Sequence, residues 1–253
     1  MDDCLRTYLL FLSNCQSMEE LWTAHTEKMA QFGFDRIIYG FTRYRSGTSL
    51  GDPEDFIILT NHDKDYMDVF LGEAHYANAP MVNWALTNEG VGSWGMLEAE
   101  NRLKDLSPAE KRLLEINCAV GVTAGYTISF KSISARSKGA IALTAKRGMS
   151  QADADAVWAE HGRNIHLMNN IAHLKILSLP YSGPKRNLTK RQREALEWVG
   201  DGKTMQDIAI LMGLTSATVE KHLRLARENL AVETTAQAVL KAAFANQMFI
   251  LEA

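Results

Sequence analysis

The chain has 253 residues, a formal net charge of −3, 46% hydrophobic residues and 23% charged residues. This length predicts two domains, and the composition is that of a globular protein, which excludes a disordered or fibrous chain. The small negative charge excludes a polyanion-binding surface over the whole molecule, and no apolar run approaches the roughly 18 residues that a membrane span needs.

The first quarter of the chain predicts two helices followed by two strands. Residues 5–12 are apolar at helical spacing, and residues 17–33 begin with a Ser-x-x-Glu capping box and end at a glycine. The segments 34–45 and 55–60 are rich in β-branched and aromatic residues, which predicts a pair of strands. His25 stands alone on the second helix, so we interpret it as a packing residue rather than a metal ligand.

The middle of the chain predicts further helices and a second pair of strands. Helices are expected over 63–76, after Pro80, over 98–105 and over 108–118, with a glycine-rich loop at 88–95. Strands are expected over 125–131 and 139–145, joined by a polar turn. Helices inserted between pairs of strands indicate an α+β layer structure.

A long helix is predicted over 150–177. Its apolar face is expected to contain Val157, Ile165, Met168, Ile171 and Leu174. Trp158 and Leu167 widen this face beyond the width that one sheet needs to cover. We therefore expect a homodimer that forms through this helix, with help from a final helix at about 235–245. A wide apolar stripe within a single chain is the alternative.

The predicted fold class is α+β with two domains. Residues 1–177 are expected to form an α/β/α sandwich, in which helices cover both faces of a mostly antiparallel sheet. Residues 178–187 contain two prolines and a glycine and form the linker. Residues 188–253 are expected to form a small all-α helix-turn-helix domain.

Three short helical segments lie within residues 188–229. The first begins at Thr189, the second at Thr204 with an aspartate three residues later, and the third is expected to be capped by Ser216. Two short helices and a longer one, with a glycine between them, are typical of a helix-turn-helix module. The segment 184–229 carries nine Lys or Arg against six Asp or Glu, so it is positive within an acidic chain.

The third segment is the predicted DNA-reading helix. Hydroxyls at its start and cations on its outer face can bond phosphates and base edges. Exposed helices often carry Lys and Arg without binding DNA, but the two preceding helices favour the DNA interpretation. The expected DNA-binding residues are Thr215, Ser216, Thr218, Lys221, Arg224 and Arg227, with Lys203 before the second helix.

A set of residues in this domain recurs at fixed spacing: Leu188-Thr189, Arg191, Glu194, Leu196, Gly202-Lys203-Thr204, Ile208-Ala209, Thr218-Val219, His222, Leu230 and Gln237-Ala238-Val239. In these positions the segment resembles the C-terminal DNA-binding domain of the LuxR/GerE family of bacterial transcription regulators. Gln192, Asn229 and Thr234-Thr235 depart from the family pattern, which usually has Glu, Lys and Asn-Arg there. The resemblance implies a homodimer on an inverted-repeat operator, with RNA polymerase as a candidate partner, and the lost cations imply weaker phosphate binding.

The first domain retains a second spacing, with Tyr66, Phe70, Ala79-Pro80 and Trp94 where related proteins have Trp, Tyr, Asp-Pro and Trp. Over residues 15–175 it resembles, less closely, the acyl-homoserine-lactone-binding domain of the LuxR family. The resemblance implies a ligand pocket lined by Tyr66, Phe70, Ala79, Met81, Trp94 and Ala142. Ala79 cannot accept a hydrogen bond from an amide, and Phe70 lacks a hydroxyl, so the pocket is expected to be more apolar than usual.

Three interpretations of the first domain follow. It senses an apolar ligand other than a standard lactone, it has filled its pocket with aromatic side chains and serves dimerisation or a protein partner, or it is an ordinary acyl-homoserine-lactone receptor. An enzyme is disfavoured because no Ser-His-Asp set, metal-ligand spacing or phosphate loop stands out, so no metal or cofactor is expected. Three scattered cysteines and an acidic start predict a reduced, cytoplasmic protein.

Overall fold

A computed structural model describes residues 3–47, 49–72, 75–96, 106–181, 183 and 186–250. The chain divides into two compact units, residues 1–52 with 56–177 and residues 53–55 with 178–253. Each unit has its own secondary structure, and each is described here by itself. No helix among these residues is long and apolar enough to cross a bilayer.

The first unit contains an antiparallel sheet of five strands. The strands are β1 (Arg36–Thr42), β2 (Ile57–Thr60), β3 (Gly90–Ser93), β4 (Gly125–Ser129) and β5 (Lys138–Thr144). Their order in the sheet is β2-β1-β5-β4-β3, so β5 lies at the centre. Ile38 pairs with Ala142, and Ala142 in turn pairs with Thr127, which aligns three neighbouring strands. The expected antiparallel sheet is confirmed.

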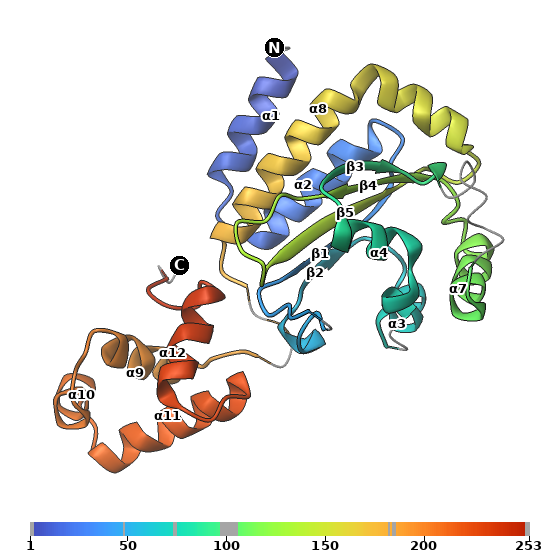
Figure 1. The fold of residues 1–253 in the computed structure, drawn as a ribbon. Coiled ribbons are helices and arrows are strands. Elements are labelled where there is room, and N and C mark those ends of the chain that lie inside the picture. Colours follow the sequence, from blue (N-terminus) through green and yellow to red (C-terminus); the bar gives the residue numbers. More distant parts are fainter. Residues whose placement is uncertain are drawn as a thin grey trace. The chain divides into compact units, whose positions relative to one another are not determined.

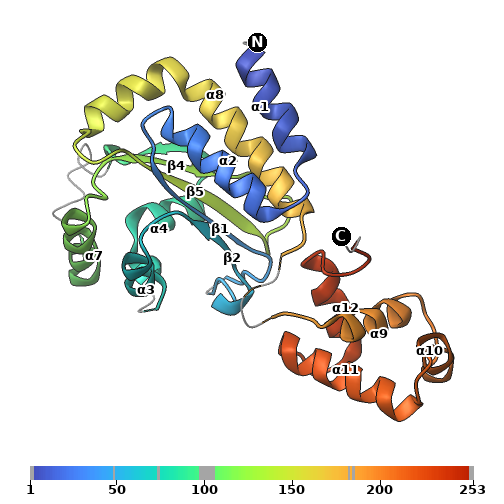
Figure 2. The same ribbon diagram turned by 180° about the vertical axis from the view of Figure 1, so that it is seen from behind.

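Helices cover both faces of this sheet (Figures 1 and 2). One layer consists of α1 (Asp3–Asn14), α2 (Met18–Ala30) and α8 (Gln151–Ser178). The other layer holds α3 (Lys64–Gly72), α4 (Pro80–Thr87) and α7 (Pro108–Ala119), with the 3-10 turn η2 (His75–Asn78) between α3 and α4. A further 3-10 turn, η1 (Pro53–Asp55), belongs to the second unit. The α/β/α arrangement predicted from the sequence is therefore confirmed.

The two faces of the sheet differ because successive side chains of a strand alternate in direction. Tyr39 of β1 is fully buried, and its hydroxyl lies 2.8 Å from Nδ1 of His173 on α8. Its neighbours Ile38 and Gly40 face the opposite layer, where they line a cavity. The α8 side of the sheet is thus closely packed, whereas the α3 and α4 side encloses free volume.

Three predictions for this unit need comment. The segment 88–95, expected as a loop, contains the edge strand β3, whose glycine Gly92 lies directly against the ring of Trp84. An edge strand pairs with one neighbour only. A glycine-rich segment can therefore form the strand β3 when pairing with β4 and packing against Trp84 hold the segment in place. On α8, Leu174 was expected on the packed face but is 62% exposed. The helix expected over 98–105 lies outside the described residues.

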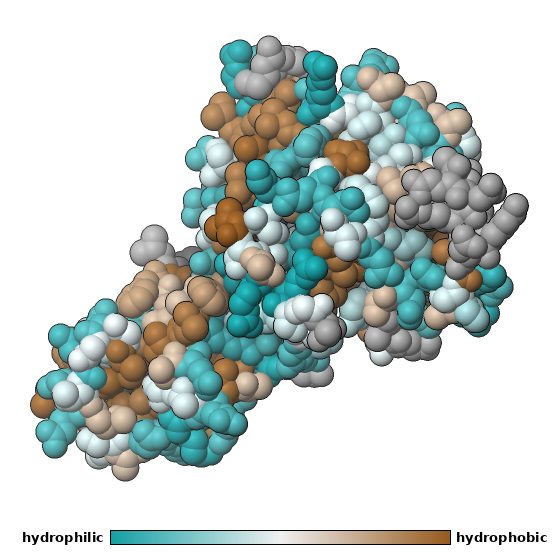
Figure 3. Space-filling model, viewed as in Figure 1, coloured by the Kyte–Doolittle hydropathy of each residue, from teal (hydrophilic) through white to brown (hydrophobic). Residues whose placement is uncertain are grey.

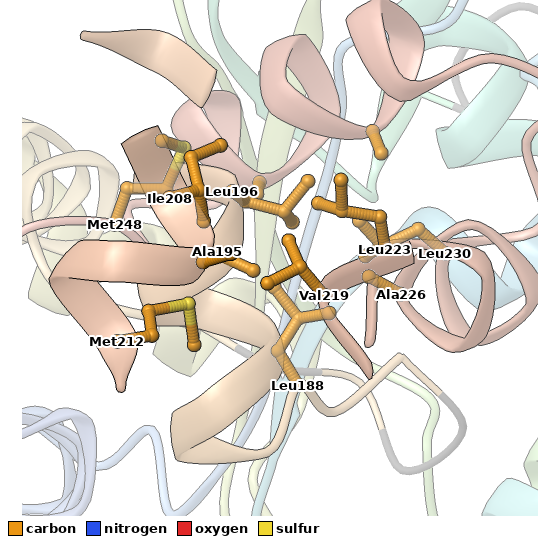
Figure 4. Close-up of a cluster of buried hydrophobic side chains, with 13 residues drawn as sticks. Leu188, Ala195, Leu196, Ile208, Met212, Val219, Leu223, Ala226, Leu230 and Met248 are labelled. Carbon is orange, nitrogen blue, oxygen red and sulfur yellow. The ribbon is translucent and has the colours of Figure 1, made fainter. Parts of the chain in front are cut away.

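The second unit is a bundle of four described helices. These are α9 (Lys190–Gly200), α10 (Met205–Met212), α11 (Ser216–Leu230) and α12 (Thr235–Phe244). Their inner faces meet in one apolar core, in which Leu196, Val219 and Leu223 are almost completely buried (Figure 4). Val219, Leu223 and Ala226, which recur at helical spacing in the sequence, all face this core. The predicted final helix is confirmed.

The turn between α10 and α11 follows from two local features. Gly213 ends α10 in the left-handed conformation, at φ 65°, which a glycine adopts without steric cost. Thr215 then caps α11, because its hydroxyl accepts a hydrogen bond from the backbone N–H of Thr218. The prediction that Ser216 is the cap is wrong by one residue, and Ser216 is the first residue of the helix.

Apolar side chains remain exposed on both units. On the first unit they include Leu10 and Phe11 of α1 and Leu167 and Leu174 of α8. Hydrophobic residues gather along α1 and over parts of the second unit (Figure 3). On the second unit the exposed set includes Leu240 and Phe244, which lie one turn apart on α12.

Candidate ligand cavity and DNA-binding helix

A cavity of about 450 Å³ lies between the sheet and the layer of α3, α4 and α7. Strand residues form its floor, and side chains from α3, η2, α4 and α7 form its walls. This volume falls within the range of small-molecule sites, which are usually apolar with a few placed polar groups. Among the described residues that line it there is no Asp or Glu.

The cavity brings together all six residues expected to line a ligand pocket: Tyr66, Phe70, Ala79, Met81, Trp94 and Ala142. Tyr66 and Phe70 lie one turn apart on α3, and their rings stack with centroids 5.7 Å apart. Ala142 faces the cavity from the central strand β5. The placement agrees with the expectation, while the contact of these residues with a ligand stays a prediction.

Neutral polar groups gather at one end of the cavity. The Tyr66 hydroxyl donates a hydrogen bond to Oδ1 of Asn117 over 3.1 Å, and Nε2 of His62 lies 3.5 Å from the hydroxyl of Thr144. Burial raises the pKa of Tyr66 to about 12. Burial, with a smaller effect of nearby Arg36, lowers the pKa of His62 to about 4. Both groups are therefore uncharged near neutral pH, so this end suits a neutral polar group of a ligand.

A second polar contact holds Trp94 at the wall of the cavity. Its indole N–H donates to the hydroxyl of Thr127 on β4 over 2.9 Å. This bond fixes the ring next to the sheet, because Trp94 directly follows β3, which pairs with β4. The indole donor is thus already satisfied inside the protein, and the ring presents mainly apolar surface to the cavity.

Sequence reasoning missed several residues of the cavity, namely His62, Asn117, Thr127, Lys138 and Thr144. Two of them carried a usable signal. His62 lies four residues before Tyr66 and just ahead of α3, and Thr144 follows the predicted Ala142 by two residues on the same strand, which places it on the same face. Asn117 carried no such signal, because its place depends on how α7 packs against α3.

The predicted DNA-reading helix α11 presents several of its predicted residues to solvent. Ser216 and Lys221 are exposed, and so is Lys203, which precedes α10. The hydroxyls of Thr215 and Thr218 lie 2.9 Å apart at the start of the helix. These two threonines therefore shape the helix start, in addition to any contact with phosphate.

The two arginines of α11 differ in exposure and in their partners. Arg224 is half exposed and pairs with Glu228 one turn later. Arg227 is mostly buried, where it pairs with Glu220 over 2.9 Å and donates to the hydroxyl of Thr235. Lys221 and Arg224 are thus the better-placed cations for DNA, whereas Arg227 ties α11 to α12.

Asn229 is one of the departures that were expected to weaken phosphate binding. Its side-chain amide instead bonds the carbonyl of Asn187 and the side chain of Gln192, at the start of α9. Position 229 therefore serves the packing of α11 against α9 in this chain. The weaker phosphate binding that the resemblance implies stays a prediction.

Comparison with known proteins agrees with both halves of this description. The model of the autoinducer binding domain matches residues 17–176, and that of sigma-70 region 4 matches residues 186–230. The transcriptional activator protein AnoR of Acinetobacter nosocomialis is 24% identical over 246 residues, which cover 95% of each chain. The quorum sensing-dependent transcriptional regulator RpaR of Rhodopseudomonas palustris is 27% identical over 209 residues, with 80% and 81% covered.

A solved structure shares the fold over almost the whole chain. SdiA in complex with octanoyl-rac-glycerol has a TM-score of 0.53 at 19% sequence identity, with 97% of each chain covered. An autoinducer-binding domain joined to a helix-turn-helix domain defines a transcription regulator rather than an enzyme. The chain belongs to the LuxR family of quorum-sensing transcriptional regulators.

Proposed function

We propose that the protein is a ligand-responsive regulator that binds operator DNA as a homodimer. The observation that carries the proposal is the open cavity, because a domain that had filled its pocket with aromatic side chains would leave no such volume. Its lining combines apolar surface with a few neutral polar groups, as expected for an acyl-type or other apolar signal. The solved relative SdiA binds an acyl glycerol, which supports a ligand of this type.

Two features support DNA binding by a dimer. Lys221 and Arg224 are exposed on α11, the helix that a helix-turn-helix module places in the major groove. Exposed leucines on α8 and α12 offer apolar surface for a second copy. A twofold dimer reads an inverted repeat, with half-sites about 10 to 10.5 base pairs apart or a multiple of this spacing.

The test is selection of binding sites from random DNA with the full-length protein, followed by titration of the selected site. Lys221→Ala is expected to weaken binding by about 1 to 3 kcal/mol if Lys221 contacts a base, or to reduce the salt dependence if it contacts phosphate. Lys111→Ala is the control, since it removes the same charge from the exposed face of α7 in the other unit. If the Lys221→Ala and Lys111→Ala variants bound the selected DNA site with equal affinity and equal salt dependence, α11 would not be the helix that lies in the groove.

A further inference from the structure

A cationic residue lines the cavity, and the binding of a neutral apolar ligand does not explain its presence there. Lys138, the first residue of β5, is 8% exposed and lines the cavity wall. Among the described lining residues it is the one Lys or Arg. A neutral apolar ligand offers no partner for an ammonium group in the cavity wall, and a charge held there without a counter-charge is costly.

The surroundings of Lys138 compensate its charge only in part, through exposed Glu89. Its Nζ donates to the backbone carbonyl of Asn88 over 3.0 Å, and no ion pair with a described carboxylate forms within 4.0 Å. Burial lowers the pKa of the Lys138 ammonium; exposed Glu89 raises it and Arg45 lowers it by smaller effects. An ammonium group has three N–H donors, so the contact with Asn88 leaves donors for a ligand.

Lys138 also borders a second, polar hollow of about 430 Å³. Arg45, Thr87, Ser134 and Ser137 line this hollow together with Glu89. The apolar cavity and the polar hollow thus share the Lys138 side chain as part of their walls. Two cations, one carboxylate and several hydroxyls lie where the apolar volume ends, so this end is polar with a net positive charge.

The opposite end of the cavity lies far along the same strand. Lys138, Ala140, Ala142 and Thr144 all line the cavity, and Thr144 lies six residues after Lys138, which is about 20 Å along a strand. Small residues occupy the middle, so the floor between the ends is apolar and unobstructed. The Thr144 end holds the neutral groups of His62 and Tyr66, whereas the Lys138 end is cationic.

We propose that the cavity binds a fatty-acid-type amphiphile whose carboxylate is held by Lys138, with Arg45 contributing to the positive potential. The apolar chain lies along β5 toward His62 and Tyr66. This inference rests on the proposed ligand-responsive function and specifies the class of ligand. It also accounts for the absence of an acidic side chain at position 79. A fatty acid has no amide N–H, so the ligand offers no donor whose hydrogen bond a carboxylate there would accept.

The experiment compares two probes with the same chain, decanoate and methyl decanoate, by calorimetry with the full-length protein below the micelle concentration. Decanoate is expected to bind about 10- to 100-fold more tightly than the ester, which is the usual value of a hydrogen bond to a charged group. Lys138→Met removes the charge, shortens the side chain by one atom, and should abolish this preference while retaining affinity for the ester. Arg45→Gln should reduce the preference several-fold.

Lys131→Met is the matched control, because Lys131 is exposed just beyond β4 and lines neither hollow. It should keep the full preference for decanoate. Equal or tighter binding of the ester by the unmodified protein, or a preference that survives Lys138→Met, would overturn the carboxylate assignment and leave ligand binding intact. The carboxylate assignment would also be overturned if neither decanoate nor methyl decanoate bound to any variant. If the protein bound no small molecule of any class, the proposed ligand response would be wrong as well.

Discussion

The side-chain amide of Asn229 donates a hydrogen bond to Oε1 of Gln192 over 3.2 Å, between residues 37 positions apart in the sequence. The same oxygen accepts a bond from the backbone N–H of Thr189, the cap of α9. The resemblance to the LuxR family implies Glu and Lys at positions 192 and 229. The two departures therefore meet in the fold, as a neutral pair that joins α9 to α11.

Restoring both charges should reveal their coupling. Gln192→Glu alone buries a carboxylate without a counter-charge, although it stays near the positive start of α9, and Asn229→Lys alone gains no anion. The double variant should be more stable than the sum of the single effects by about 1 kcal/mol. Urea denaturation of fragment 178–253 measures the four stabilities of the cycle. Additive single effects would show that the two positions are independent.

The exposed leucine of α8 tests the proposed dimer. Leu174→Glu should weaken dimerisation at least about tenfold, because burial of a leucine contributes about 1.5 to 3 kcal/mol and a charge there resists burial. Sedimentation of the full-length variant and of fragment 1–178 at micromolar concentration measures the effect. Ile133→Glu is the control, since Ile133 is fully exposed in the turn between β4 and β5. A monomeric fragment beside a dimeric full chain would assign dimerisation to the second unit.

A buried histidine predicts loss of stability in mild acid. His25 is fully buried between α1, α2 and α8; Tyr8 donates to its Nδ1, and its Nε2 donates to Asn169, whose own amide nitrogen donates to the Ile165 carbonyl. Both ring nitrogens are thus used by the neutral form. Burial lowers the pKa of His25 from 6.5 to about 4, against a smaller opposing effect of Asn169.

The unfolded chain therefore binds a proton at His25 between about pH 6.5 and 4, where the folded chain does not. The stabilising contribution is complete above pH 6.5 and decreases as the pH falls through this range. At pH 5.5 the loss at this residue is about 1 kcal/mol. Thermal melting at pH 7.5 and 5.5 should show a smaller decrease for His25→Gln than for the unmodified protein. The same decrease in both would show that His25 does not titrate in this way.

The sequence predicted the local features of the fold and missed those that depend on distant packing. The capping box of Thr204 and Asp207 was predictable, because it involves two residues three positions apart. β3 was missed because Gly90 and Gly92 have low strand propensity, and pairing with β4 determines their conformation.

The same distinction applies to the cavity. Four residues of the cavity wall could be predicted from the resemblance to the family, through the spacing of Tyr66, Phe70, Ala79 and Trp94. Lys138 could be placed there only from the register of β5, which determines the face on which each side chain lies. The partner of Asn229 could not be predicted either, because the contact depends on how α11 packs against α9.

The last prediction concerns Ala79, which is buried in the cavity wall and is also the N-cap of α4, with no side chain to bond the helix start. Ala79→Asp supplies both an N-cap, which is worth about 1 kcal/mol, and an acceptor for a ligand amide. Without a ligand, the gain from the cap is opposed by the cost of placing a carboxylate in an apolar wall. The variant should bind a long-chain acyl-homoserine lactone about one to two decades more tightly, with a further gain from Phe70→Tyr. Ala79→Asn is the control, since it caps the helix without a charge and should gain less affinity. Calorimetry with the lactone and melting without it measure both effects. A lower melting temperature with no gain in affinity would show that position 79 does not face the ligand, and tight lactone binding by the unmodified protein would make an acid at position 79 unnecessary.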